Sequence, residues 1–229
     1  ALNPDAPILE PSVLDAAREA QKGGADSITI HVREDRRHMQ DADARLMRKE
    51  VNLPLNFELA NTVEMVAFAC DLKPDFACLV PESREEITTE GGLDAIGHFD
   101  SLKDTIIALQ GSGIKVSLFI DPEEEQIEAA AKLGAEMIEL HTGSFALAEG
   151  EPHQNELSRL RLSADLAASL GLQVNAGHGI HRQNINSLFS VKNLKEINVG
   201  HTLVSRALFI GLRAAVAEMK ALMAAYQGD

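Results

Sequence analysis

The chain of 229 residues is 45% hydrophobic and 24% charged, a globular composition that excludes long disorder, collagen and a simple coiled coil. Its 21 basic and 35 acidic residues give a formal net charge of −14, so it repels polyanions and we expect no nucleic-acid or membrane partner. No apolar stretch approaches the roughly 20 residues of a membrane span, and Ala1–Pro11 lacks the pattern of a signal peptide. Cys70 and Cys78 lie in apolar runs, which indicates buried free thiols and a cytoplasmic protein.

Short β-branched and apolar runs recur along the chain, and each is followed by polar residues and then by a segment with helical spacing. Strands that alternate with helices are typical of right-handed βαβ units around a parallel sheet. In chain order, the predicted strands are Ser27–Val32, Leu55–Leu59, Phe76–Val80, Lys115–Ile120, Met137–His141, Gln173–Asn175 and Glu196–Val199.

Two of the intervening segments carry clear helix signals. Pro11–Gln21 has an apolar stripe, and the glycine pair Gly23-Gly24 that follows it is typical of a helix end. Pro122–Lys132 begins with a proline and a run of glutamates, which suit the first turn of a helix, and Asp121 is the expected N-cap.

The number and order of these elements favour a barrel. A closed (β/α)₈ barrel has eight strands, whereas a doubly wound sheet would carry a Gly-rich dinucleotide fingerprint after its first strand, and none is present. Because the chain opens on a helix, we expect one (β/α)₈ TIM-barrel domain over residues 1–229 whose first strand is missing from this sequence. Ser205–Tyr226 is predicted to be the longest helix, and the spans Pro81–Gly113 and Thr142–Leu170 each have room for an extra helix.

Polar residues gather at the predicted carboxyl ends of the strands. In a parallel barrel these ends share one rim, where catalytic residues lie. A satisfied polar cap or a solvated loop would explain any one of these residues. Seven such ends that converge on one pocket favour an active site instead. In chain order they carry His31 with Arg33, Glu58, Glu82 with Thr88 and Thr89, Asp121, Glu139 with His141, Asn175 with His178, and His201.

The segment His31–His38 is the densest of these clusters. Its three arginines, Arg33, Arg36 and Arg37, can offer paired N–H donors to phosphate or carboxylate. Its two histidines can transfer protons near neutral pH. A charged surface loop is the alternative interpretation, because two acidic residues lie among the arginines. The position directly after a strand favours a functional site.

Glycine-containing segments follow the last two predicted strands. Asn175–His181 contains two glycines, and Val199–His201 leads into a helix expected near Val204. Loops after the last two strands of a barrel, together with a helix N-terminus, often bind phosphate. The histidines and carboxylates of the rim could instead bind a metal. The sequence has no H-x-H pair on a strand and no H-E-x-x-H helix, so we expect no metal.

These segments resemble the pyridoxine 5′-phosphate synthase family, which closes the ring in deoxyxylulose-dependent vitamin B6 biosynthesis. The resemblance runs through the whole chain in the family's order, in ITIHVREDRRHM, LNFELA, CLVPESREEITTEGGLD, VSLFIDPEEEQIEAA, IELHTG, LGLQVNAGHG and INVGH. The family's opening strand, with its V-N-x-D-H-type motif and the basic loop after it, has no counterpart here. The resemblance implies a (β/α)₈ barrel with extra helices, assembled as an octamer. It also implies condensation of 3-amino-2-oxopropyl phosphate with 1-deoxy-D-xylulose 5-phosphate, without a metal or an organic cofactor.

The resemblance implies roles for ten residues. His31 and Glu58 match general bases, and His178 matches a general acid. Glu139 matches a carboxylate that stabilises charge during the reaction. The residues that match contacts to the deoxyxylulose phosphate are Arg33, His38 and Thr88, and those that match contacts to the aminoketone phosphate are Gly179, Gly200 and His201.

Two rival functions remain open beside this one: a phosphosugar aldolase or epimerase on the same fold, and a non-catalytic phosphate-binding scaffold. A phosphosugar aldolase on the same fold would need a lysine on a barrel strand for a Schiff base, but Lys115 opens its strand at the amino end. A phosphosugar epimerase would usually need a metal, so activity that survives EDTA would exclude it. A non-catalytic phosphate-binding scaffold would leave the acid/base residues at the strand ends unexplained. Schiff-base formation, proton removal and loss of water are acid/base steps, and they need several titratable groups around one pocket.

Overall fold

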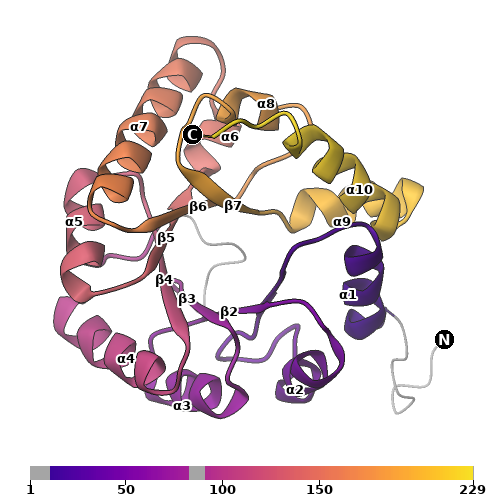
Figure 1. Ribbon diagram of the computed structural model, residues 1–229. Coiled ribbons are helices and arrows are strands. Elements are labelled where there is room, and N and C mark those ends of the chain that lie inside the picture. Colours follow the sequence, from indigo (N-terminus) through magenta and orange to yellow (C-terminus); the bar gives the residue numbers. More distant parts are fainter. Residues whose placement is uncertain (1–10, 83–90, 229) are drawn as a thin grey trace.

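The computed structural model describes residues 11–82 and 91–228. Within these residues, seven parallel strands alternate with helices and curl into an incomplete ring, and the helices lie on its outer side (Figure 1). Neighbouring strands follow the chain order from β1 to β7. The curled parallel sheet confirms the predicted (β/α) barrel architecture.

The strands agree with the sequence pattern to within two residues at each end. Side chains alternate between the two faces of a strand, so every second residue of each strand faces the helices and the others face the barrel interior. The strands are β1 (Ile28–His31), β2 (Leu55–Leu59), β3 (Phe76–Leu79), β4 (Lys115–Ile120), β5 (Met137–His141), β6 (Gln173–Gly177) and β7 (Leu194–Asn198).

The main hydrophobic core is a shell between the sheet and the helices. Strand residues such as Ile30, Phe57 and Leu118 belong to one continuous buried cluster together with apolar helix residues. The alternate positions face the interior and include many polar side chains. Those that are buried there are Asn56, Ser117, Glu139 and Asn175. The interior of the barrel is therefore polar, and it opens on the rim formed by the carboxyl ends of the strands.

Ten helices lie in the described residues. None of them combines the length and the apolar character needed to cross a bilayer. They are α1 (Val13–Lys22), α2 (Asp41–Glu50), α3 (Val63–Leu72), α4 (Phe99–Gly111), α5 (Glu124–Leu133), α6 (Gly143–Leu147), α7 (Gly150–Ser169), α8 (Ile185–Leu188), α9 (His201–Ile210) and α10 (Leu212–Met223). The extra helix expected in Thr142–Leu170 is present, because both α6 and α7 lie there. In Pro81–Gly113, the described residues contain α4 alone.

Two helix predictions were wrong in detail. The predicted helix Ser205–Tyr226 is divided by Gly211, whose φ of 79° and ψ of 151° are incompatible with a helix, so the 20-residue α7 is the longest helix described. The predicted N-cap of α5, Asp121, does not cap the helix, and Glu123 occupies that position. The carboxylate of Asp121 instead binds a histidine of the neighbouring strand.

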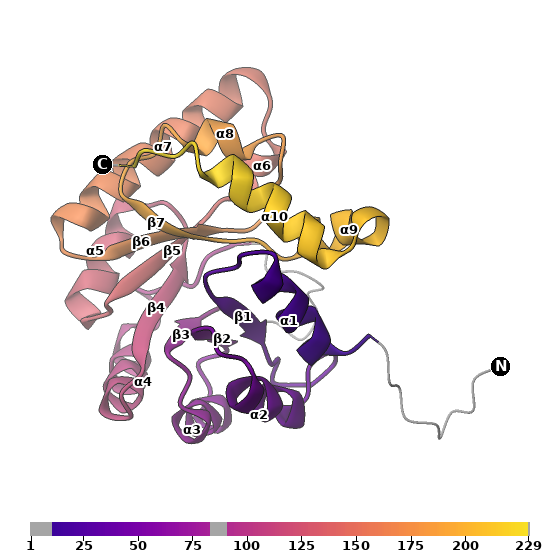
Figure 2. The ribbon, with the colours of Figure 1, turned by 45° about the vertical axis from the view of Figure 1, so that its right-hand side comes forward.

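The ring is open between β1 and β7. Among the described residues, β1 pairs with β2 alone and β7 with β6 alone. On the inside, the hydroxyl of Thr29 donates a 2.8 Å hydrogen bond to the side-chain oxygen of Asn198. On the outside, α1 packs against α10, where Arg213 Nε lies 3.0 Å from Glu19 Oε2 (Figure 2). These contacts bring the two edges of the sheet together, so all seven strands contribute to one rim.

Candidate active site

The ends of β1 and β2 bring His31 and Glu58 together. Parallel pairing places the two residues in register, so both side chains enter the barrel interior. His31 Nδ1 lies 3.8 Å from Glu58 Oε2. Burial raises the pKa of Glu58 above its ordinary value, and the neighbouring His31 opposes this rise. A carboxyl with a raised pKa beside an imidazole is suited to accepting a proton near neutral pH.

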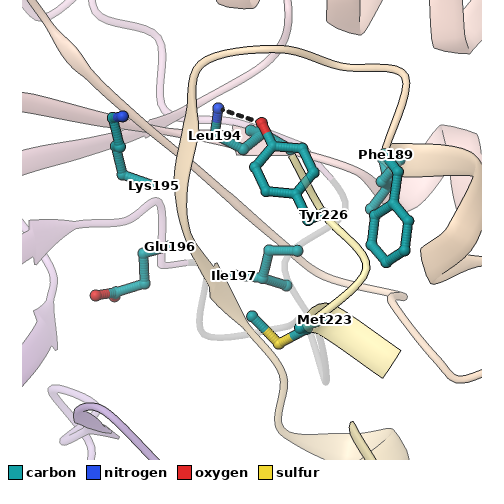
Figure 3. Close-up of a pocket in the computed structure, with 8 residues that line it drawn as sticks. Phe189, Leu194, Lys195, Glu196, Ile197, Met223 and Tyr226 are labelled. Atoms are coloured by element: carbon teal, nitrogen blue, oxygen red, sulfur yellow. Dashed lines mark hydrogen bonds between the residues drawn. The ribbon is translucent and has the colours of Figure 1, made fainter. Parts of the chain in front are cut away.

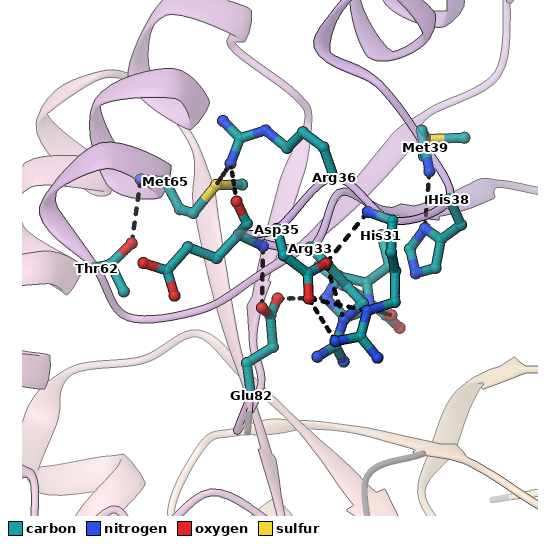
Figure 4. A network of polar contacts seen from close by, with 12 residues as sticks. His31, Arg33, Asp35, Arg36, His38, Met39, Thr62, Met65 and Glu82 are labelled. Carbon is teal, nitrogen blue, oxygen red and sulfur yellow. Dashed lines mark hydrogen bonds and ion pairs between the residues drawn. The ribbon is translucent and has the colours of Figure 1, made fainter. Parts of the chain in front are cut away.

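Glu82 joins this pair from the segment after β3. Its carboxylate accepts a hydrogen bond from His31 Nε2 at 2.8 Å and another from the backbone N–H of Glu34 at 3.0 Å (Figure 4). Burial by itself would raise the pKa of Glu82, but these hydrogen bonds outweigh it and lower the pKa. The carboxylate therefore holds the imidazole with Nε2 as the hydrogen-bond donor to Glu82 and with Nδ1 towards Glu58.

The sequence pattern placed Glu82 at the end of a strand but predicted no role for it. The signal that was available is its place in the CLVPE run, three residues beyond the end of β3. Thr88, which was predicted to contact substrate, lies outside the described residues.

The three arginines of the segment His31–His38 serve different purposes. Arg36 lies 2.8 Å from Asp41 and 2.6 Å from Glu64, both of which lie on helices outside the barrel. Arg37 Nε donates a 2.9 Å hydrogen bond to the side chain of Asp35. Two of the three arginines therefore have acidic partners within 3 Å, as the surface-loop interpretation expected.

Arg33 lies with the histidines of the rim, and its contact with Asp35 is longer than the contacts of the other two arginines with acidic side chains. Its side chain is buried, and Arg33 Nε is 3.6 Å from Asp35 Oδ1. The rings of His31 and His38 meet edge to face, with 5.8 Å between their centres. Figure 4 shows Arg33, His31 and Glu82 gathered at one point. This cluster offers a guanidinium and two imidazoles on one side of the rim.

Glu139 lies deep in the barrel on β5 and is 1% exposed. Its Oε2 accepts a 2.7 Å hydrogen bond from Asn198 Nδ2, whereas its Oε1 makes no hydrogen bond within the described residues. Burial raises the pKa of Glu139 well above its ordinary value, and the nearby carboxyls of Glu58 and Glu196 raise it further. The protonated acid is thus favoured, with one oxygen left for a ligand.

Replacing Gly177 by alanine is expected to destabilise the protein by about 1–3 kcal/mol, the usual cost of overpacking a core. The added Cβ would lie 1.9 Å from Glu139 Oε1, so the buried carboxyl must move, which disturbs the hydrogen bond that it accepts from Asn198. The melting temperature should fall by roughly 2–12 °C for a chain of this size. Gly111→Ala is the matched control, because a Cβ there meets nothing within 4 Å. An unchanged melt of Gly177→Ala would contradict the close approach of Glu139.

His178 follows β6 and is surrounded by rings. Its ring centre lies 4.6 Å from that of Phe119 and 5.5 Å from that of His141. His141 is held in turn by Asp121, whose Oδ1 is 2.9 Å from His141 Nδ1. Burial lowers the pKa of His178 to about 4, and the charges of His141 and His31 act in the same direction. The neutral imidazole is therefore the stable form of His178 near pH 7.

The glycine segments after β6 and β7 lie next to one another. Gly179 has a φ of 71°, which a residue without a side chain adopts readily. Gly200 is the N-cap of α9, and His201 is its first residue. The hydroxyl of Thr202 donates a 2.6 Å hydrogen bond to the carbonyl of Ile180, which links the two segments. The first N–H groups of a helix have no partner within the helix and carry the positive end of its dipole, so this corner of the rim suits an anion.

A small cavity of about 50 Å³ lies away from this rim (Figure 3). It is lined mostly by apolar side chains of α8, β7 and α10, and Tyr226 closes it by donating a 2.9 Å hydrogen bond to the carbonyl of Val191. Its lining runs along β7 from Leu194 to Ile197 and includes none of the predicted site residues. In residues 11–82 and 91–228, no three histidine, cysteine, aspartate or glutamate side chains gather as they would around a metal ion.

Over residues 6–225, the chain matches the family described as pyridoxal phosphate biosynthesis protein PdxJ. The chain belongs to this family. It is 63% identical over 213 residues to the pyridoxine 5′-phosphate synthase of Akkermansia muciniphila. This alignment covers 93% of this chain and 87% of that protein. It is 50% identical over 216 residues to the enzyme of the same name from Thermosynechococcus vestitus, in an alignment that covers 94% of this chain and 91% of that protein. The resemblance drawn from the sequence motifs is confirmed.

Solved structures outside the PdxJ family share the architecture. KGPDC from Streptococcus mutans superposes with a TM-score of 0.67 at 12% identity, covering 93% of this chain and 92% of that one. The phosphoribosyl anthranilate isomerase from Thermus thermophilus gives a TM-score of 0.60 at 14% identity, covering 91% and 94%. At such identities the likeness shows the barrel fold alone.

Proposed function

We propose that this PdxJ-family protein is a pyridoxine 5′-phosphate synthase. It condenses 3-amino-2-oxopropyl phosphate with 1-deoxy-D-xylulose 5-phosphate and releases pyridoxine 5′-phosphate, phosphate and water. The observation that carries the proposal is the meeting of a carboxyl of raised pKa, Glu58, with the imidazole of His31 inside a polar barrel. The supporting observation is the family match over residues 6–225.

The acid/base residues divide the reaction's proton transfers between them. Glu58 and His31 act as general bases that remove protons beside carbonyl or imine carbons. Glu139, a buried acid with an oxygen that receives no hydrogen bond from the described residues, stabilises charge that develops on the substrate. His178 acts as the general acid that protonates a leaving oxygen. None of these steps needs a metal or an organic cofactor.

Two anion sites hold the two phosphorylated substrates. Arg33 and His38 bind the deoxyxylulose phosphate, and Thr88 remains a predicted third contact. Gly179, Gly200 and His201 bind the aminoketone phosphate at the start of α9, where the helix dipole favours negative charge. The first site lies beyond β1 and the second beyond β6 and β7, and because the β1 and β7 edges of the ring meet, both substrates are held over the same barrel interior.

Replacing Arg33 by alanine is expected to weaken binding of 1-deoxy-D-xylulose 5-phosphate by about 1.5–3 kcal/mol, the range for hydrogen bonds to charged groups. This corresponds to a rise of roughly 10- to 150-fold in the dissociation constant, which isothermal titration calorimetry can measure. Arg37→Ala is the control, because Arg37 is bound to Asp35 and lies 40% exposed. A dissociation constant that does not change in Arg33→Ala would remove Arg33 from the phosphate site.

The direct test of the proposed function is incubation of the protein with both substrates while the absorbance of pyridoxine 5′-phosphate is followed. We expect product only when both substrates are present, and an undiminished rate in EDTA. Loss of the rate in EDTA would show that the reaction needs a metal and would contradict the proposed metal-free mechanism, and absence of product with both substrates present would favour the phosphosugar epimerase or aldolase. The aldolase alternative is disfavoured by Lys115, the first and exposed residue of β4, which lies at the amino end of the strand and 5.9 Å from the ring centre of Phe76.

Residues 1–229 are proposed to act as one TIM-barrel domain in a cytoplasmic homo-oligomer, as the family resemblance implies an octamer. The support for self-association is α9, in which none of the residues is buried. Its side chains Leu208 and Phe209 are 81% and 83% exposed, which is unusual for large apolar residues in a monomer. The two cysteines are free thiols, which agrees with a reducing compartment.

A further inference from the structure

The backbone of His178 adopts a conformation that is unusual for a residue with a side chain. Its φ is 75°, in the left-handed region, and it shares a positive φ with only three other non-glycine residues in the described part of the chain. Backbone of this kind persists only where the surroundings hold it, and it is frequent at functional sites. The turn at His178 directs the imidazole back against Phe119 and His141, so the position of the ring depends on what holds the turn.

The hydroxyl of Thr142 holds this turn. Thr142 follows β5 directly and is fully buried. Its Oγ1 lies 2.6 Å from the carbonyl oxygen of Gly177 and 2.5 Å from that of His178, so one hydroxyl proton is shared between the two carbonyls that flank the turn. The backbone N–H of Thr142 donates a further bond to the carbonyl of Gly177 at 2.9 Å.

The same short segment also supports the ring and the residue after it. His141, directly before Thr142, lies edge-on to the imidazole of His178. Helix α6 begins directly after Thr142, and its Ala146 approaches so closely that a Cβ on Gly179 would lie 2.4 Å away. The segment from His141 to Ala146 therefore contacts the turn at His178 and at Gly179, and Thr142 supplies the hydrogen bonds.

We propose that Thr142 is a positioning residue that holds His178 in the geometry required for its proton transfer. This inference rests on the proposed function of His178 as general acid. A hydroxyl is needed there because a side chain of the same shape without it would leave the carbonyl of His178 without its donor, take one of two donors from the carbonyl of Gly177, and release the turn. The imidazole would then leave its place against Phe119, and misplacement of a catalytic group by about 1 Å can cost roughly 100-fold in rate.

The decisive variant is Thr142→Val, which keeps the side-chain shape and removes the hydroxyl. We expect kcat for formation of pyridoxine 5′-phosphate to fall about 10- to 100-fold, while KM for 1-deoxy-D-xylulose 5-phosphate stays within about twofold, because Arg33 and His38 are not affected. Thr142→Ser keeps the hydroxyl and should restore most of the lost kcat. Should the valine variant fail to fold, Thr142→Ala takes its place in the same comparison.

A second readout does not depend on turnover. In protein labelled at histidine, NMR follows the imidazole of His178, whose pKa is held at about 4 in the native site. In Thr142→Val this pKa should rise towards the ordinary value as the ring leaves its buried position, and the ring-current shift from Phe119 should diminish. Thr105→Val is the matched control, since Thr105 is a buried threonine of α4 whose hydroxyl bonds to Asn61 at 2.6 Å.

The two readouts separate this proposal from the proposed function. A wild-type protein that makes no pyridoxine 5′-phosphate, but whose His178 resonance moves in Thr142→Val, would overturn the function and support the positioning role. An active wild type whose valine variant keeps both kcat and the His178 resonance would overturn the positioning role. Loss of kcat in Thr105→Val as large as that in Thr142→Val would also overturn it, because the effect would then follow from general destabilisation.

Discussion

Replacing Glu58 by glutamine is expected to lower turnover about 10²- to 10⁴-fold, the usual contribution of a positioned base. Glutamine has nearly the same shape but cannot accept a proton from the substrate. His31→Asn should have an effect of similar size, because His31 lies 3.8 Å from Glu58 and is proposed to act on the same substrate. Steady-state kinetics with both substrates measures the loss, and near-wild-type turnover in either variant would remove that residue from the mechanism.

Thermal melts show whether such a loss comes from misfolding. Because burial raises the pKa of Glu58, the folded protein binds the carboxyl proton more tightly than the unfolded chain does. Stability from this group is therefore complete at low pH and falls as the pH rises above the unfolded value of about 4.3. Glutamine removes this penalty, so Glu58→Gln should melt at or above the wild-type temperature near pH 7. A markedly lower melting temperature of Glu58→Gln would mean that the lost turnover comes from a disturbed structure. Glu128→Gln on the surface of α5 is the matched control and should leave turnover unchanged.

Replacing His178 by asparagine is expected to lower turnover by about 10²- to 10⁴-fold as well, through loss of the general acid. With a pKa of about 4, His178 by itself holds too little proton near pH 7 to donate one efficiently. Bound phosphate groups favour the imidazolium and should raise this pKa. The wild-type kcat should therefore decrease as the pH rises through the pKa of the substrate complex, whereas kcat/KM should decrease at a lower pH, set by the free protein. In His178→Asn, this decrease of kcat with rising pH should disappear.

Inorganic phosphate provides a simple probe of that shift. An NMR titration of His178 with and without saturating phosphate should show a pKa of about 4 that rises when the anion is bound. For the turnover measurement on His178→Asn, the matched control is His153→Asn. His153 lies on α7 with its Nδ1 3.3 Å from the carbonyl of Phe145, so its replacement should leave turnover unchanged. A pKa of His178 that phosphate does not move would contradict its role as the acid that both substrates activate.

Much of the barrel follows from local patterns in the chain. The strand runs predict all seven strands to within two residues, because alternating apolar residues and flanking glycines are read from neighbouring positions. The rule that parallel strands share one catalytic rim then places His31 beside Glu58, and the register of β1 and β2 bears this out. The family motifs added the roles that spacing alone left open.

Other features depended on contacts between distant parts of the chain. Asp121 has a favourable local pattern for a helix cap, but a histidine 20 residues later takes its carboxylate. Glu82 meets His31 across 51 residues, and Thr142 meets the carbonyl of His178 across 36. Arg36, predicted with its neighbours to offer donors to an anion, instead pairs with acidic residues on the two helices α2 and α3.

The sequence by itself determined the order of strands and helices, the polar rim and the family, since these follow from residue types and their spacing. The tertiary structure decided which carboxylate faces which imidazole and how far each pKa moves. The reason is physical. A pKa depends on burial and on charges within a few ångströms, and for Glu58, Glu139 and His178 these neighbours come from different strands. Closing the sheet into a barrel creates that environment, which no local stretch of the chain contains.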